Sequence, residues 1–172
     1  DRLTHEGAIA CQSCHPNGAA DGTTWHFQEG PRNSPALWGG VTQTAPFHWD
    51  ASVPDMAAIS DKTIVGRMGG AGLDGAHMNE IAAFLDSVPA PAAPVVDEAS
   101  AARGRAIFES SEANCVSCHA GAMLTDNKTH DIPGIGDAEP GVGLIGHQFA
   151  TPWLRGLAYT APYLHDGSAK TL

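Results

Sequence analysis

All four cysteines of this 172-residue chain belong to one short motif that occurs twice. In a Cys-x-x-Cys-His motif the two thiols can add to the vinyl groups of a haem, while the adjacent imidazole binds its iron. A zinc site would need both cysteine pairs, or a second histidine pair, on one metal, and a thioredoxin-like redox pair needs no histidine. The pattern therefore predicts two covalently attached c-type haems. The residues involved are Cys11, Cys14 and His15 in CQSCH, and Cys115, Cys118 and His119 in CVSCH.

The haem motif and the charge of the chain also bear on its compartment and partners. Covalent haem c is assembled outside the cytoplasm, so we expect a periplasmic or extracellular protein. The chain has no apolar run of about 18 residues that could span a bilayer. With 19 acidic residues against 9 basic ones, a net charge of −10 disfavours nucleic acid and anionic membranes as partners. We expect redox partner proteins or neighbouring cytochrome subunits, and a homo-oligomer remains open.

The two haem motifs belong to an internal repeat. His26 and His130 each follow the histidine of their motif by 11 residues. Further on, both halves contain Pro-x-Leu-x-Gly and then Thr-Ala-Pro-aromatic, in GPRNSPALWGGVTQTAPFHWD and HQFATPWLRGLAYTAPYLHDG. Between the halves, the Pro- and Ala-rich stretch VPAPAAPVV predicts an extended linker. We therefore predict haem domains at residues 1–90 and 99–172, joined by a linker at 91–98.

Few segments have the periodicity of a helix. Residues 99–108 are good helix formers that lead into the second motif, and residues 3–10 are their shorter counterpart. Residues 76–88 end before a proline and place an apolar stripe on one face, formed by Met78, Ile81, Ala82, Leu85 and Val88. Strand signals are weak, and 20 Gly and 12 Pro residues indicate many loops. The sequence predicts two mostly α domains with long irregular loops, each stabilised by its haem.

Three stretches carry a resemblance to a known family: GPRNSPAL, CHAGAMLTDNKTHDIPG and TPWLRGLAYTAPYLHDG. With them, the chain resembles the bacterial di-haem cytochrome c peroxidase and MauG superfamily over nearly its whole length. The resemblance implies two cytochrome c-like domains in tandem. It also implies that the C-terminal haem stores electrons and that peroxide reacts at the N-terminal haem. Trp49 matches the tryptophan that bridges the two haems in this family.

Two features depart from the family pattern. Residues 52–75 are shorter than the corresponding loop and contain no counterpart of the acidic residue and glutamine that handle peroxide protons there. The family takes the sixth ligand of its C-terminal haem from beyond the histidine of the HDG motif, here His165, and the sequence given ends at Leu172. We therefore expect a second domain truncated at its C-terminus. Its sixth ligand is then expected to be His165, His147 or His130, or a residue of a neighbouring chain.

The first haem has two candidates for its sixth ligand. Met68, in TIVGRMGG, precedes the closing helix as in small cytochromes c, and a thioether ligand raises the reduction potential. His26 matches the position that provides a distal histidine in the resting peroxidases. Arg32 and Arg155 are expected to occupy the same relative place in the two halves, where each could pair with a haem propionate.

These observations predict a di-haem c-type cytochrome that transfers electrons outside the cytoplasm. The alternative is a di-haem peroxidase or MauG-like oxidoreductase that acts on hydrogen peroxide and needs one open or weakly ligated iron. A third possibility is a haem module of a larger secreted protein. The sequence assigns no catalytic residue, because it contains no hydrolase, nucleotide-binding or zinc-protease motif.

Overall fold

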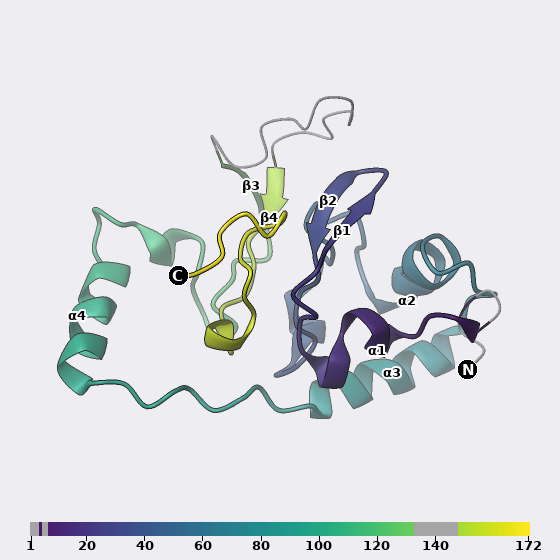
Figure 1. The fold of residues 1–172 in the computed structure, drawn as a ribbon, viewed down its shortest axis with the longest axis horizontal. Coiled ribbons are helices and arrows are strands. Elements are labelled where there is room, and N and C mark those ends of the chain that lie inside the picture. Colours follow the sequence, from purple (N-terminus) through teal and green to yellow (C-terminus); the bar gives the residue numbers. More distant parts are fainter. Residues whose placement is uncertain (1–3, 5–6, 133–147) are drawn as a thin grey trace.

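The computed structural model describes residue 4 and residues 7–132 and 148–172 of the chain. Its regular elements are short, and long loops connect them (Figure 1). The α-helices are α1 (Cys11–Cys14), α2 (Met56–Ile59), α3 (Gly75–Ser87) and α4 (Glu98–Phe108). Short 3₁₀ helices cover Pro16–Gly18, Val41–Thr44, Cys115–Ser117 and Leu157–Tyr159, and a π-helix, η4, covers Ser60–Val65.

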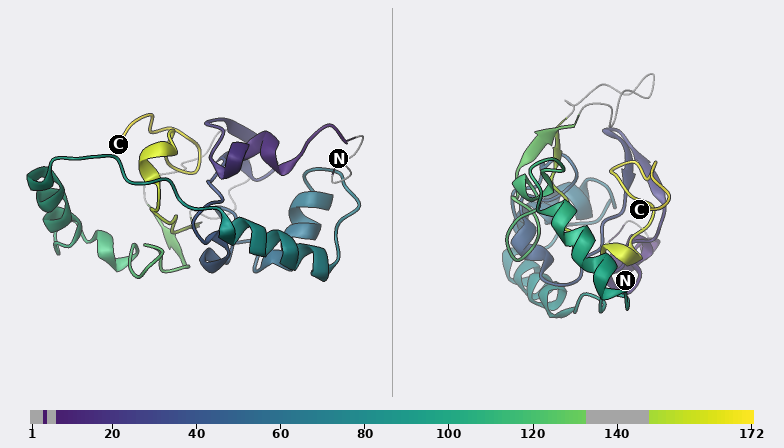
Figure 2. Two further views of the ribbon diagram at one scale, coloured as in Figure 1. Left: turned by 90° about the horizontal axis from the view of Figure 1, so that it is seen from below. Right: turned by 90° about the vertical axis from the view of Figure 1, so that its left-hand side faces the viewer.

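Two small antiparallel sheets occupy the middle of the elongated molecule, with α4 at one end and α2 and α3 toward the other (Figures 1 and 2). One sheet pairs β1 (Thr24–Phe27) with β2 (Gly30–Asn33). The other pairs β3 (Thr129–Asp131) with β4 (Gln148–Ala150). The sequence did not predict these sheets, because strands of three or four residues carry almost no alternating pattern. Helices occupy a minority of the described chain, so "mostly α" overstates their share.

The two longer helices confirm the sequence prediction. Helix α3 begins after Asp74, whose carboxylate accepts a hydrogen bond from the His77 amide. Helix α4 begins after Asp97, whose carboxylate accepts one from the Ser100 amide. The predicted stripe of α3 is also confirmed, since Met78 is buried and its four partners are half-buried. The helix predicted at residues 3–10 is wrong for residues 8–10, which have no regular structure; the α-helical turn instead covers Cys11–Cys14.

The packed apolar core is small for the chain length. Among the described residues, the buried apolar ones are Ala36, Trp38, Val41, Val53, Ile64, Met78 and Met123. Helix α4 has no buried residue, and its Ile107 is 63% exposed. A domain with so little core usually needs a further stabilising group, such as a metal or a disulfide. Among the described residues, no helix combines the length and the apolar character that a bilayer span requires.

Residues 89–97 join α3 to α4 without helix or strand, in an extended path along one side of the molecule (Figure 2). This agrees with the conformation expected of a Pro- and Ala-rich segment. The hydroxyl of Tyr159 donates a hydrogen bond to the carbonyl of Ala92, which fastens the segment to the second half. The domain boundaries themselves stay a prediction.

Candidate functional site

The first Cys-x-x-Cys-His motif is tied to a segment 20 residues further on. Helix α1 carries the two cysteines, and the next residue, His15, places its Nδ1 2.8 Å from the carbonyl oxygen of Pro35. A hydrogen bond at Nδ1 fixes the orientation of the ring and leaves Nε2 for a metal. Burial lowers the pKa of His15, against the opposing effect of this hydrogen bond. The imidazole is therefore held in the neutral form that binds iron.

The second motif is built more locally. His119 places its Nδ1 2.9 Å from the carbonyl oxygen of Leu124, only five residues away in the same loop. The ring of Phe108, at the end of α4, lies with its centroid 6.5 Å from that of His119. Both motif histidines therefore use Nδ1 for a backbone carbonyl and have Nε2 available.

A cavity of about 590 Å³ lies beside His119. Its apolar walls come from α4, the motif and two later loops, and they include Phe108, Val116, Leu124 and Leu154. At Gly104 of α4, a Cβ would meet no described atom within 4 Å. A mainly apolar cavity with the imidazole of the motif in its wall fits a porphyrin, and this group would cover the face of α4 that contributes Gly104 and Phe108 to the wall.

The two halves bind each other through reciprocal backbone hydrogen bonds. The Asn33 amide donates to the carbonyl of His165 at 2.5 Å, and the Ala150 amide donates to the carbonyl of Trp49 at 2.7 Å. Asn33 and Ala150 both stand two residues before the proline of the repeated Pro-x-Leu-x-Gly segment. The two halves therefore meet in a nearly symmetric way, and Trp49 and His165 occupy equivalent positions in this contact. We call this contact the seam.

Aromatic rings fill the centre of the seam. The rings of Trp49 and His165 meet edge to face with centroids 6.4 Å apart, and Phe149 stacks on His165 at 4.0 Å. The indole N–H of Trp49 donates to the carbonyl of Asn33 at 2.7 Å. His165 is only 4% exposed, and its burial lowers the pKa of the imidazole. Trp49 thus lies where the two halves meet, and its role as an electron bridge stays a prediction.

The arginines predicted as propionate partners are not equivalent. Arg32 pairs with Trp25 in the first sheet, and Phe149 pairs with His130 in the second. Aligning the two sheets by their strand pairing therefore makes Phe149 the counterpart of Arg32. Arg155 corresponds instead to Trp38, with which it forms another reciprocal contact: the Trp38 indole donates to the Arg155 carbonyl, and the Arg155 guanidinium donates to the carbonyl of Gly39. The prediction that Arg32 and Arg155 occupy equivalent positions in the two halves is wrong, because it did not take the pairing of the strands into account.

Arg32 is a buried cation. It is 8% exposed, its guanidinium donates to the carbonyls of Pro31 and Glu29, and it lies 5.8 Å from the centre of the Phe149 ring. Burial lowers the pKa of Arg32, although the charges of nearby Asp50 and Glu29 oppose this effect. No carboxylate forms an ion pair with Arg32 among the described residues, and a buried charge is costly without a counterion. The pairing of Arg32 with a haem propionate stays a prediction. Arg155 is exposed and already bonded.

Met68 lies in the turn after η4 and is half-buried. The neighbouring Arg67 fixes this turn, because its guanidinium pairs with Glu29 and lies 4.2 Å from the centre of the Phe27 ring. Sequence analysis did not single out His48, which contacts the same helix. Its Nε2 lies 3.1 Å from the hydroxyl of Thr63 in η4. Burial and the charge of Arg67 lower the pKa of His48 to about 4.

The other candidate iron ligands lie in different surroundings. His26 is an exposed residue of β1 opposite Pro31. His130 is the counterpart of Trp25 rather than of His26, so the matching 11-residue spacings do not reflect equivalent positions. The His130 imidazole is already bonded to Asp126, with 2.7 Å between Nε2 and Oδ2. His147 lies outside the described residues. No contact in the structure tests either Met68 or His26 as a ligand.

Known proteins resemble the chain over most of its length. No family model matches it. The methylamine utilization protein MauG of Methylorubrum extorquens is 30% identical over 99% of this chain, which spans 63% of that relative. Cytochrome-c peroxidase IdrP2 of Pseudomonas sp. (strain SCT) is 25% identical over 99% of this chain and 67% of its own length. The chain therefore spans less than two thirds of the MauG relative.

A solved structure shares the fold. The crystal structure of a MauG-like protein associated with microbial copper homeostasis superimposes with a TM-score of 0.71 and 24% sequence identity, over 99% of this chain and 68% of that protein. The two homologous sequences support membership of the di-haem cytochrome c peroxidase and MauG superfamily, and the solved structure shows the same fold.

Proposed function

We propose that the chain is a di-haem c-type cytochrome, with one haem attached to Cys11 and Cys14 and the other to Cys115 and Cys118. The observation that carries this proposal is the shared geometry of the two motif histidines, each of which gives Nδ1 to a backbone carbonyl and leaves Nε2 for iron. When bound, haem c supplies one-electron oxidation and reduction of its iron. Each haem would complete the core of one of two tandem cytochrome c-like domains.

The protein supplies the path and the charge around the haems. Trp49, at the centre of the seam, is the proposed electron bridge, and the rings of His165 and Phe149 extend the same aromatic cluster. Arg32 is the proposed partner of a haem propionate, since its buried charge has no ion pair within the described residues. Met68 is the proposed sixth ligand of the first haem, and His26 is the alternative.

The proposed setting is the periplasm or the extracellular space, where c-type haems are attached. The acidic chain suits a neutral or basic electron-transfer partner, because opposite charges speed and orient the encounter of two proteins. Electron transfer between such partners, or along neighbouring cytochrome subunits, is the proposed activity.

The second candidate function is that of the relatives, a peroxidase or MauG-like oxidoreductase. Cleavage of peroxide benefits from an acid or base within hydrogen-bonding reach of it. Residues 52–75 contain three carboxylates, of which two cap helices: Asp55 accepts from the Ala58 amide and Asp74 from the His77 amide. The third, Asp61, is exposed in η4. This arrangement favours electron transfer and weak peroxide turnover.

Mass spectrometry of the denatured holoprotein tests the proposal directly. We expect the mass of the polypeptide plus two haems, and a mass with one haem, no haem or zinc would contradict it. Optical and paramagnetic resonance spectra with and without peroxide separate the two functions. Low-spin signals that peroxide leaves unchanged support electron transfer, whereas a high-spin iron and rapid peroxide-dependent oxidation of a reduced small cytochrome would establish the enzyme.

A further inference from the structure

The two motif histidines share a further feature: the carbonyl that orients each ring belongs to a segment held by the other half. In the first half, the acceptor for His15 is the carbonyl of Pro35, which lies between Asn33 and Trp38 in the chain. The Asn33 amide and the Trp38 indole both donate hydrogen bonds to backbone carbonyls of the second half. The acceptor for His15 is therefore fixed on both sides by bonds across the seam.

In the second half, the corresponding carbonyl is that of Leu124, 2.9 Å from Nδ1 of His119. Leu124 has a φ angle of 55°, a left-handed backbone conformation that few residues other than glycine and asparagine adopt. Such a conformation costs free energy and persists only where the surrounding structure holds it. The contacts on either side of Leu124 therefore keep its carbonyl directed at His119.

Met123 makes the first of these contacts. Its side chain is buried, and it packs against the first half, because a Cβ at Gly40 would lie 3.8 Å from its Cε. One nitrogen of the Arg155 guanidinium donates both to the Met123 sulfur, at 3.6 Å, and to the carbonyl of Gly39, at 2.7 Å. Met123 is therefore bound to the first half directly and through Arg155.

Asn127 makes the second contact. Its side-chain amide donates to the carbonyl of Gln43 in the first half at 3.0 Å. Between the two contacts, the hydroxyl of Thr125 donates to the carbonyl of Thr151 at 2.7 Å, which ties the same stretch to its own half. Leu124 is thus held between a residue packed on the first half and one bonded to it.

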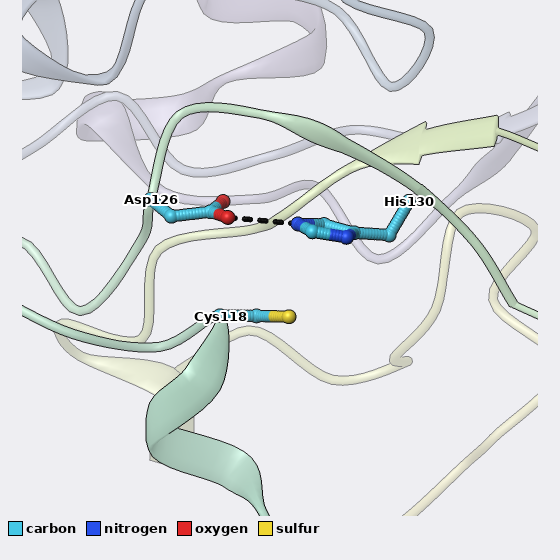
Figure 3. A group of neighbouring side chains, drawn as sticks. All are labelled: Cys118, Asp126 and His130. Carbon is cyan, nitrogen blue, oxygen red and sulfur yellow. Dashed lines mark hydrogen bonds and ion pairs between the residues drawn. The ribbon is translucent and has the colours of Figure 1, made fainter.

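The loop that contains Leu124 returns to the motif from which it starts. Asp126 accepts a hydrogen bond from His130, and both side chains lie beside Cys118, with their polar atoms and its sulfur all within 4.8 Å of one another (Figure 3). Cys118 directly precedes His119. The loop is closed at its base by the second half, while Met123 and Asn127 connect it to the first.

We propose that the first half positions the proximal histidine of the second haem, with Met123 and Asn127 as the positioning residues. The inference rests on the proposed function, because it requires an iron bound to Nε2 of His119. A carbonyl only accepts hydrogen bonds, so the proton of the neutral imidazole is on Nδ1. The bond from Nδ1 to Leu124 increases the basicity of the ring toward the metal, which stabilises the ferric state and lowers the reduction potential.

Loss of these contacts should change the potential in one direction. In the redox couple, one electron from a redox partner protein converts the ferric iron to the ferrous iron, and the Nδ1 proton stays on His119 in both states. Without its contacts to the first half, Leu124 relaxes from the left-handed conformation and the bond from Nδ1 weakens. The potential of the second haem should then rise, whereas that of the first, whose His15 is oriented by Pro35, should stay unchanged.

Redox titrations of the two-haem protein at one pH compare Asn127→Gly with the matched control Asn114→Gly. Both asparagines are in the second half and have positive φ angles, 56° and 52°, so glycine fits the backbone at either position. The Asn127 side chain bonds to Gln43, whereas that of Asn114 has no hydrogen bond among the described residues. We expect one midpoint potential to rise in Asn127→Gly, with a change in the paramagnetic resonance signal of one ferric haem, and neither change in Asn114→Gly.

Unchanged midpoint potentials in an Asn127→Gly protein that has both haems overturn the proposal. An equal shift in Asn114→Gly also overturns it, because it would assign the effect to backbone flexibility. If Asn127→Gly does not retain both haems, Met123→Leu decides, since leucine keeps the volume but removes the sulfur that accepts from Arg155. One midpoint should rise in that variant, and two unchanged midpoints contradict the proposal.

The denatured mass separates this inference from the proposed function. A wild-type protein without two haems refutes the proposed function and the positioning role with it. Two haems whose potentials do not respond to Asn127→Gly refute the positioning role alone.

Discussion

The two halves of the molecule share a framework and differ at the positions that carry chemistry. Both have a haem motif, a short two-stranded sheet, a Thr-Ala-Pro turn and a reciprocal place in the seam. At equivalent positions in the seam, the first half has Trp49 and the second has His165. Beside the motif cysteines, the first half has Trp25 and the second has His130. The repeat therefore keeps the positions of the two Cys-x-x-Cys-His motifs while it varies the groups around them.

The halves also differ in how they hold the proximal histidine. The ring of His15 is fixed by Pro35, which follows β2, so the first site depends on the packing of its sheet and of the seam. The ring of His119 is fixed by Leu124 in its own loop, and the neighbouring α4 has no buried residue. We therefore expect the second site to depend more than the first on the proposed haem.

The strongest test of this difference removes each haem in turn. Cys115→Ser with Cys118→Ser, and Cys11→Ser with Cys14→Ser, should each lower the denatured mass by one haem. We expect the second-half variant to lose more helix, because an 11-residue helix with no buried residue is marginal in water. Far-ultraviolet circular dichroism measures the helix content. Equal helix loss in the two variants would show that α4 does not depend on its haem.

The next test concerns the sixth ligand of the first haem. Met68→Ala should remove the sulfur-to-iron charge-transfer absorption at long wavelength and lower the potential of that haem, because a thioether ligand raises it. Met56→Ala is the matched control, since Met56 is also half-buried but lies in α2. If Met68→Ala leaves the spectrum unchanged and His26→Ala creates a high-spin signal, the ligand is His26.

Local patterns in the sequence were enough to find part of this architecture. Motif spacing identified His15 and His119 as candidate ligands, an apolar stripe predicted α3, and a run of good helix formers predicted α4. Linear spacing failed where the register of a hairpin decides, so it matched His130 with His26 rather than with Trp25. Residues that are equally spaced from the two motifs are therefore not always the residues that occupy equivalent positions in the paired strands.

The seam could not be predicted from either half alone. Phe149 and His165 come together with Trp49 only because the two halves dock, and no local pattern marks a residue for such a contact. The same holds for His48, whose environment depends on η4 and on Arg67. Long-range packing, rather than propensity, decides these positions.

A pair of glycines tests how tightly the seam packs. Gly156 and Gly121 have positive φ angles of 74° and 71°, so alanine strains the backbone similarly at both, by about 1 kcal/mol. A Cβ at Gly156 would lie 2.8 Å from Nε1 of Trp38, whereas one at Gly121 would meet no described atom within 4 Å. We expect Gly156→Ala to lower the free energy of unfolding by about 1–3 kcal/mol more than Gly121→Ala does. Denaturant titration of the holoproteins measures the difference. Equal losses of unfolding free energy in the two variants would show that the contact between Gly156 and Trp38 can rearrange to admit a methyl group.

The smallest expected effect is a pH dependence that belongs to the first half. Burial, with the charge of Arg67, lowers the pKa of His48 from 6.5 to about 4, so the folded protein keeps this imidazole neutral. Between these values the unfolded chain binds more protons than the folded one, and stability therefore falls as the pH decreases from 6.5 to 4. At about 1.4 kcal/mol per pKa unit, and allowing for the partial exposure of the ring, the loss is on the order of 2 kcal/mol. His48→Gln, which can still bond to Thr63, should lose less stability over this range. Parallel stability curves for the two proteins between pH 6.5 and 4 would mean that His48 is solvated when protonated, and that the packing of η4 against it is looser than the structure shows.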